Sequence, residues 1–190
     1  MKRYKKIIFS ALVAYLIYYI YQRMQNPPLR EDLEKFIKDL HPTVQKKFRD
    51  FIREVEEKTQ HRVQIASAYR GWDYSVRIWQ TYPEVQRCCK PGKDYHFFGL
   101  AVDLVLISPT GERLGLAAPA QKWQATGIGE IAKKYNLRWG IYFPGYYDPV
   151  HFDYGVYRMD DLVNRAEQLN GSLQNTEGNK MSFAGLEKIR

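Results

Sequence analysis

Residues 100–107 read Leu-Ala-Val-Asp-Leu-Val-Leu-Ile, an apolar run that only Asp103 interrupts. A short apolar run rich in Val, Leu and Ile predicts a strand that is buried on both faces. A lone carboxylate in such a strand is costly to bury unless a cation or several hydrogen-bond donors face it. The fold must therefore bring a partner to Asp103.

Two histidines and a second carboxylate are the candidate partners. His96 precedes Asp103 by seven residues, and Gly99 and Ala101 between them have no bulk to block a close approach of the backbone. His151 begins the short aromatic segment His-Phe-Asp-Tyr, with Asp148 three residues before it. Two histidines and one carboxylate are a common catalytic zinc set that leaves the fourth position open for water. The spacings alone fit equally a core histidine beside a buried Asp–Arg pair, so both interpretations stay open at this point.

The order of the predicted elements indicates an α+β domain. Helices are predicted over 29–40, 43–59, 72–82, 121–135 and 160–169, and strands over 62–69, 100–107, 138–142 and 150–154. Helices and strands are mixed without a regular βαβ alternation, which favours a small antiparallel sheet flanked by helices. We place this domain at residues 27–169. Residues 170–190, rich in Gly, Asn and Ser at their start, are predicted to be a flexible tail.

The first 26 residues predict a membrane anchor. Residues 1–6 are strongly basic, and residues 7–21 contain no charge. No small-x-small cleavage site follows, so an uncleaved single-pass signal anchor is favoured over a removed signal peptide. The positive-inside rule then leaves the N-terminus in the cytoplasm and places the domain outside the cytoplasmic (inner) membrane. The alternative is a buried core helix.

The net charge does not indicate a nucleic-acid binder. The formal charge is +8, but residues 1–26 hold five basic and no acidic side chains, which leaves 24 basic against 21 acidic residues, or +3, for the rest. Neither a basic stripe nor a known reading motif is present in that remainder. We therefore expect no nucleic-acid partner.

Four segments resemble one family of zinc peptidases. The stretch HFFGLAVDL, residues 96–104, resembles the H-x-x-G-x-A-x-D signature of D-alanyl-D-alanine carboxypeptidases and of the L-alanyl-D-glutamate endopeptidases of phage endolysins and bacterial wall hydrolases. Three further segments follow the family's order: SAYR at 67–70, YNLRWG at 135–140 and DPVHF at 148–152. The resemblance spans about residues 42–155. It implies a D,D-peptidase/Hedgehog-like zinc fold, which is α+β.

The resemblance also implies roles for five residues. His96, Asp103 and His151 would hold Zn²⁺, and Asp148 would be the general base that takes a proton from water. Arg70 would neutralise charge that develops on the scissile carbonyl oxygen, because its guanidinium does not lose its proton. The alternative for Arg70 is a structural salt bridge with a surface acid.

The implied function is hydrolysis of the peptidoglycan stem peptide. The D-x-x-H form and the Trp-Gly element favour an L-alanyl-D-glutamate endopeptidase of endolysin type, with a D,D-carboxypeptidase as the alternative. A non-hydrolytic zinc-containing binding module is a further alternative, which the presence of both Asp148 and Arg70 disfavours. Two departures concern the substrate groove: Ile141 follows Trp139-Gly140 where the endolysin branch often has a second glycine, and Asp94-Tyr95 precedes His96.

Overall fold

The structure is a computed structural model that describes residue 13 and residues 29–82 and 89–186. Its elements are α2 (Glu31–Lys38), α3 (Pro42–Thr59), β1 (Arg62–Ser67), α4 (Trp72–Thr81), β2 (Ala101–Ile107), β3 (Arg113–Leu114), α6 (Ala120–Ala125), α7 (Ile128–Lys134), β4 (Arg138–Trp139), β5 (His151–Asp153) and α8 (Met159–Asn170), with 3₁₀ turns η1 (Gly140–Tyr142), η2 (Leu173–Asn175) and η3 (Gly178–Lys180). The α+β class with a small sheet is confirmed.

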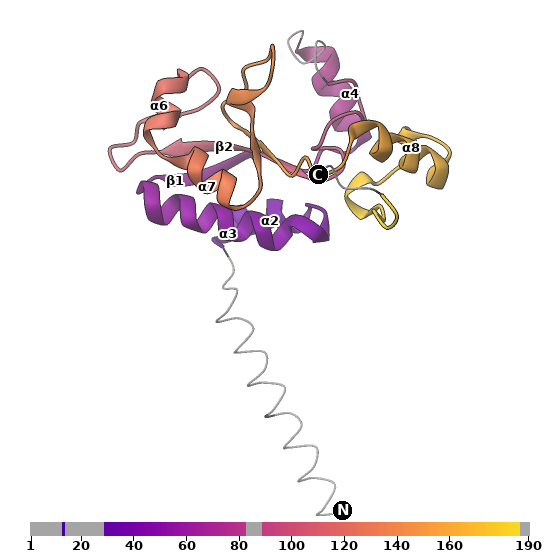
Figure 1. Ribbon diagram of the computed structural model, residues 1–190, viewed down its shortest axis with the longest axis horizontal. Coiled ribbons are helices and arrows are strands. Elements are labelled where there is room, and N and C mark those ends of the chain that lie inside the picture. The colour runs from indigo at the N-terminus through magenta and orange to yellow at the C-terminus, as the bar shows by residue number, and fades with distance from the viewer. Residues whose placement is uncertain (1–12, 14–28, 83–88, 187–190) are drawn as a thin grey trace, which may run out of the picture.

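The sheet is antiparallel and has the order β1-β2-β5-β4, with β3 pairing to β2. Helices α2 and α3 lie along one side of it (Figure 1). The two faces follow the period of the strands: Val102 and Phe152 point into the core, where Phe152 lies 5.2 Å from the ring of Phe51 in α3. Alternate residues therefore point to the opposite face, where Asp103 and His151 are register partners.

Helix α3 is the main support of the sheet. Its five buried residues recur at helical spacing and pack on the core. The helix begins after His41, whose ring Nδ1 accepts a hydrogen bond from the Thr43 N–H and caps the first turn. It ends at Thr59, and the next residue, Gln60, has the left-handed conformation. The buried residues are Val44, Phe48, Phe51, Ile52 and Val55.

Two predicted elements are interrupted by glycine. The helix predicted over 121–135 is two helices, α6 and α7, because Gly127 adopts a φ of 76° between them. The strand predicted over 138–142 ends at Trp139, and the chain turns into η1 at Gly140. The turn at Gly140 directs the chain away from β4 and into the loop that leads to β5.

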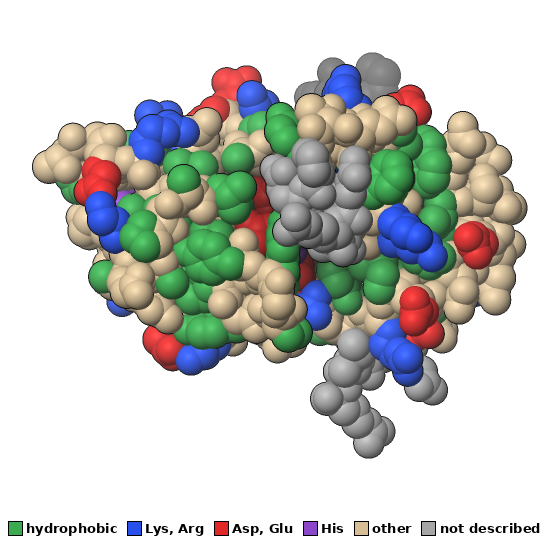
Figure 2. All heavy atoms as spheres, turned by 90° about the horizontal axis from the view of Figure 1, so that it is seen from above, with side chains coloured by type: hydrophobic (Ala, Val, Ile, Leu, Met, Phe, Trp, Pro, Cys, Tyr) green, Lys and Arg blue, Asp and Glu red, His purple; other side chains and the backbone are tan. Residues whose placement is uncertain are grey.

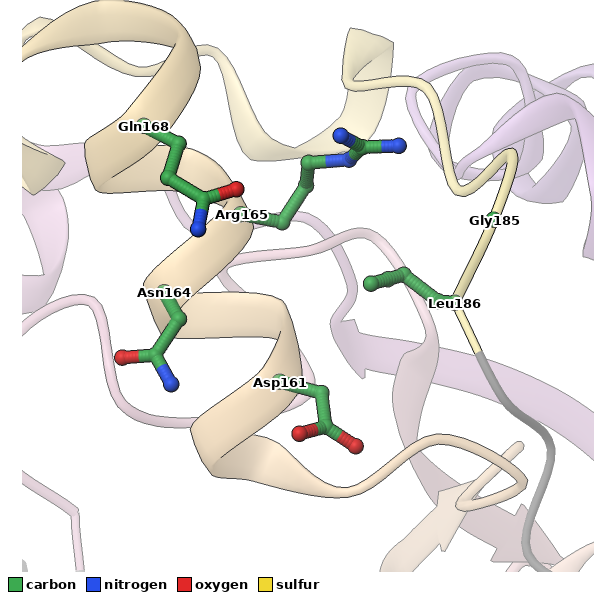
Figure 3. A pocket seen from close by; sticks show the side chains of 6 residues that line it. All are labelled: Asp161, Asn164, Arg165, Gln168, Gly185 and Leu186. Atoms are coloured by element: carbon green, nitrogen blue, oxygen red, sulfur yellow. The ribbon is translucent and has the colours of Figure 1, made fainter.

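Residues 171–186 pack on the domain, in contrast to the flexible tail that the sequence predicts. Leu173, Met181 and Phe183 are buried, although they are widely spaced among polar residues. Arg165 of α8 donates a hydrogen bond to the carbonyl of Ala184, beside a polar pocket of about 330 Å³ between α8 and this segment (Figure 3). A few apolar side chains are enough to anchor a polar segment when the domain offers sites for them.

The predicted membrane segment, residues 7–21, lies outside the described residues except for residue 13. Among the residues that the structure describes, none of the helices combines the length and apolar character that a bilayer-spanning helix requires.

Candidate active site

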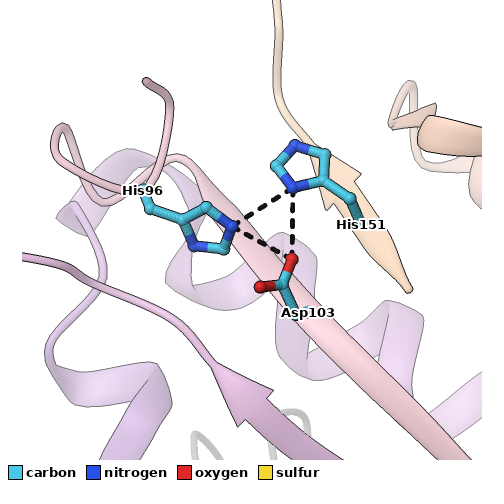
Figure 4. A group of neighbouring side chains, drawn as sticks. All are labelled: His96, Asp103 and His151. Carbon is cyan, nitrogen blue, oxygen red and sulfur yellow. Dashed lines mark hydrogen bonds and ion pairs between the residues drawn. The ribbon is translucent and has the colours of Figure 1, made fainter. Parts of the chain in front are cut away.

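Three predicted metal ligands converge on one point (Figure 4). His96 Nε2 lies 3.0 Å from Asp103 Oδ1 and 3.1 Å from His151 Nδ1, and His151 Nδ1 lies 3.2 Å from Asp103 Oδ1. The three side chains come from a turn and two strands that are distant in the sequence. Because the atoms that meet are a carboxylate oxygen and two ring nitrogens, the cluster has the donor set of a zinc site.

Strand register places two of these residues together. Asp103 in β2 is the partner of His151 in β5, so their side chains leave the same face of the sheet. His96 reaches them from a turn that precedes β2. That turn needs Gly99, which has a φ of 65°, and a Cβ there would lie 2.6 Å from the backbone nitrogen of His41.

The two residues that depart from the family's usual approach to His96 help to shape this turn. Asp94 Oδ1 accepts a hydrogen bond of 2.8 Å from the Phe97 N–H, and the Tyr95 hydroxyl donates one of 2.7 Å to the carbonyl of Tyr157. Both residues also line the pocket at the cluster. Asp94 and Tyr95 therefore affect the turn that carries His96 as well as the wall of the pocket.

The second nitrogen of each histidine is hydrogen-bonded away from the cluster. His96 Nδ1 lies 2.7 Å from the carbonyl oxygen of Ala68, and His151 Nε2 lies 3.0 Å from Asp153 Oδ2. Both acceptors favour a proton on the nitrogen that faces them, so the opposite nitrogen presents a lone pair to the cluster. The residues present therefore fit zinc in ring orientation as well as in donor type.

The cluster is strongly polarised. Asp103 is 7% exposed. Burial acts to raise the pKa of its carboxyl, but His96, His151 and Arg70 together hold this pKa well below its usual range. Burial acts to lower the pKa of His151, but hydrogen bonds to Asp103 and Asp153 overcome burial and raise this pKa to about 10. Asp103 thus stays ionised and favours one positive charge beside it, which is a proton on His151 Nδ1 when no metal is bound and would be the metal ion in its place.

Asp148 lies in the same pocket with an incomplete set of partners. Its Oδ1 is buried and has no hydrogen-bond partner among the described residues. Burial, followed by the nearby Asp103 carboxylate, raises its pKa above the ordinary value. A buried carboxylate with an unsatisfied oxygen and a raised pKa has the properties of a general base.

Arg70 contacts Asp103 directly. Its Nη2 donates to Asp103 Oδ2, and its Nε donates a hydrogen bond of 2.8 Å to Ser67 Oγ. A structural salt bridge with a surface acid was the alternative for Arg70, and the partner that the structure shows is the buried Asp103 instead. Arg70 also lines the pocket, so a role toward a bound carbonyl stays a prediction.

The pocket around the cluster has a volume of about 540 Å³. One part of its wall is apolar, including Ile78, Leu116 and Met159, and another part carries the cations Lys93 and Arg138. From above, acidic side chains are visible in a hollow that is flanked by hydrophobic ones (Figure 2). Such a cleft suits an extended chain with both apolar and carboxylate groups.

The sequence reasoning gave no role to Asp153 and Arg138. Asp153 lies two residues after His151 in the same strand, so both point to one face. Arg138 is its register partner in β4. The signal was present in the sequence as the carboxylate of Asp153 in the short segment His-Phe-Asp-Tyr, two residues after a candidate metal ligand.

One family of known proteins matches the region that contains the cluster. The sequence model of a family described as D-alanyl-D-alanine carboxypeptidase matches residues 90–154, which include His96, Asp103, Asp148 and His151. No curated protein sequence matches the chain. A solved structure, the Serratia marcescens L-Ala D-Glu endopeptidase ChiX, is 15% identical with a TM-score of 0.49, covering 68% of this chain and 91% of that chain. Residues 90–154 are therefore similar to the D-alanyl-D-alanine carboxypeptidase family in the region that contains the His96, Asp103 and His151 cluster.

Proposed function

We propose that the chain is a zinc-dependent peptidase that hydrolyses the peptidoglycan stem peptide. The observation that carries the proposal is the convergence of the His96, Asp103 and His151 ligand atoms in the same pocket as Asp148, whose Oδ1 has no partner among the described residues. A purely structural zinc site uses four closed protein ligands and has no need of such a base. The family match supports the same chemistry.

The chain's own residues divide the work. His96, Asp103 and His151 would hold zinc, which supplies Lewis-acid chemistry by polarising a carbonyl and lowering the pKa of water. Asp148 takes a proton from the attacking water and delivers it to the leaving amine. Arg70 keeps Asp103 paired and places positive charge at the pocket, where charge develops on the scissile carbonyl oxygen.

The bond we propose is the one between L-alanine and D-glutamate. The D-x-x-H motif at Asp148–His151 and the Trp139-Gly140 element support this choice. Lys93 also lines the pocket and suits a substrate carboxylate beside the scissile bond, which both this bond and the bond to the terminal D-alanine provide. Trimming of the terminal D-alanine is the alternative cut.

Digestion of purified peptidoglycan with the full chain tests this proposal. We expect soluble fragments whose masses correspond to cleavage after L-alanine, and we expect one zinc ion per chain by metal analysis. Release of free D-alanine alone would assign the carboxypeptidase reaction. Stoichiometric zinc without any product would assign the binding module, and a chain unable to take up zinc would overturn the proposal.

We also propose that residues 7–21 anchor the chain in the cytoplasmic membrane with the domain outside. The basic residues 1–6 and the uncharged run after them support this topology, and so does the location of peptidoglycan. A reporter fused to the C-terminus should be active only outside the cytoplasm, and the chain should stay in the membrane fraction through a carbonate wash. A reporter active only in the cytoplasm would contradict the topology and leave the zinc site untouched.

A further inference from the structure

Asp153 is a buried carboxylate that touches a proposed ligand. It is 0% exposed, and its Oδ2 lies 3.0 Å from His151 Nε2. The opposite ring nitrogen, Nδ1, is the atom that faces Asp103 and His96. Asp153 therefore contacts the His151 ring at Nε2, the nitrogen that points away from the cluster.

Arg138 holds Asp153 in turn. Its Nε donates a hydrogen bond of 2.7 Å to Asp153 Oδ1, and its Nη2 donates one of 3.0 Å to Asp153 Oδ2. The two residues are register partners in β4 and β5, so the pair is set by the sheet itself. A bidentate arrangement fixes the plane of a carboxylate as well as its position.

The guanidinium of Arg138 lies between two aromatic rings and close to the backbone of Gly155. The ring centre of Tyr95 lies 4.6 Å from its central carbon, and that of Phe143 lies 5.4 Å away. A Cβ at Gly155 would lie 2.0 Å from Arg138 Nε, so this position has no space for any other residue. Aromatic contacts and an absent side chain together restrict the orientation of Arg138.

We propose that Asp153 is a positioning residue that fixes the ring of His151, and that Arg138 fixes Asp153. The inference rests on the proposed zinc site and adds to it. A carboxylate only accepts hydrogen bonds, so the nitrogen facing Asp153 is the one that keeps its proton and Nδ1 is left for the metal. Partners of this kind orient a histidine ligand, and their loss typically lowers metal affinity about 10- to 100-fold.

The test is zinc affinity, measured by competition with a chelator on the full chain. Asp153→Asn should raise the Kd for zinc about 10- to 100-fold. Because this change leaves Arg138 without its partner, the double variant Asp153→Asn with Arg138→Gln is measured too and should show the same loss. The matched control is Glu34→Gln, which breaks the partly buried ion pair with Arg49 on helices α2 and α3. It should leave zinc affinity unchanged.

A spectroscopic readout separates positioning from stability. In the wild type, the His151 Nε2–H proton should give a downfield, slowly exchanging signal in a nitrogen–proton correlation spectrum. In the double variant this signal should move upfield and exchange faster, because a neutral acceptor bonds more weakly. Wild-type zinc affinity in a folded double variant, or an unchanged His151 signal, would overturn the inference. A wild type that binds no zinc would instead overturn the proposed function, while its His151 signal still tests the contact with Asp153.

Discussion

Gly140 has no space for a side chain because of Asp148. A Cβ built on Gly140 would lie 2.2 Å from the backbone oxygen of Asp148 and 3.0 Å from its Cβ. The backbone N–H of Asp148 also donates a hydrogen bond of 3.2 Å to the carbonyl of Gly140. The Trp139-Gly140 segment and the segment 148–151 are thus in direct contact through Gly140 and Asp148. This contact fixes the position of Asp148, the proposed base.

Gly140→Ala should therefore damage both stability and activity. The new methyl group would force the Asp148 backbone away, and overpacking of this kind typically costs about 1–3 kcal/mol in the free energy of unfolding. Denaturant unfolding and peptidoglycan turnover measure the two effects. Gly115→Ala is the control, because the nearest atom to its Cβ is a Val105 methyl group at 3.9 Å. Equal stability and turnover in both variants would show that the Gly140 contact is unimportant.

Phe183→Ala should destabilise the domain although it lies near the C-terminus. The Phe183 ring stacks on His41 at 4.0 Å and contacts Tyr157 at 5.1 Å. Loss of a buried phenylalanine typically costs about 3 kcal/mol. Thermal unfolding of this variant is compared with that of Leu169→Ala, a residue of α8 that is 54% exposed. If the two variants had the same melting temperature, residues 171–186 would not unfold cooperatively with the rest of the domain.

His41 should make stability depend on pH. Burial lowers its pKa below the ordinary value of 6.5, although the hydrogen bond to the Met181 carbonyl acts in the opposite direction. The unfolded chain then binds a proton more readily than the folded domain, so the contribution of His41 is complete above pH 6.5 and is lost as the pH falls below it.

Urea unfolding between pH 5 and pH 7.5 measures this dependence. His41→Asn removes the titration and keeps a side chain that caps a helix N-terminus. The wild type should lose stability more steeply than His41→Asn below pH 6.5. Parallel curves would show that His41 does not contribute to the pH dependence.

The helices and most strands could be predicted because each has a local signal, whereas the residues that meet in the cluster were indicated by the resemblance to a known family. The buried stripe of α3 follows helical spacing, and Asp103 is conspicuous in an apolar strand. Strand pairing could not be predicted from local patterns, since the register that sets Asp103 against His151, and Arg138 against Asp153, depends on contacts distant in sequence. The support of His151 by Asp153 was missed for this reason.

Residues 171–186 show that composition alone does not predict whether a segment is ordered. Its Gly, Asn and Ser residues are typical of disorder, but Gly178 is needed where the chain approaches the carbonyl oxygen of Phe97, 2.1 Å from a built Cβ. Asn179 donates a hydrogen bond of 2.6 Å to the Asp39 carbonyl. Small and polar residues here serve close packing, which composition does not distinguish from flexibility.

The most direct test of the central claim compares the wild type with Asp148→Asn at equal zinc content. The substitution keeps the size of the side chain and all three proposed ligands but removes the proton acceptor, so turnover of purified peptidoglycan should fall about 10²- to 10⁴-fold. Mass spectrometry of the released peptides gives the rate. We expect the variant to bind one zinc and release almost no product, whereas wild-type turnover by Asp148→Asn would contradict the account.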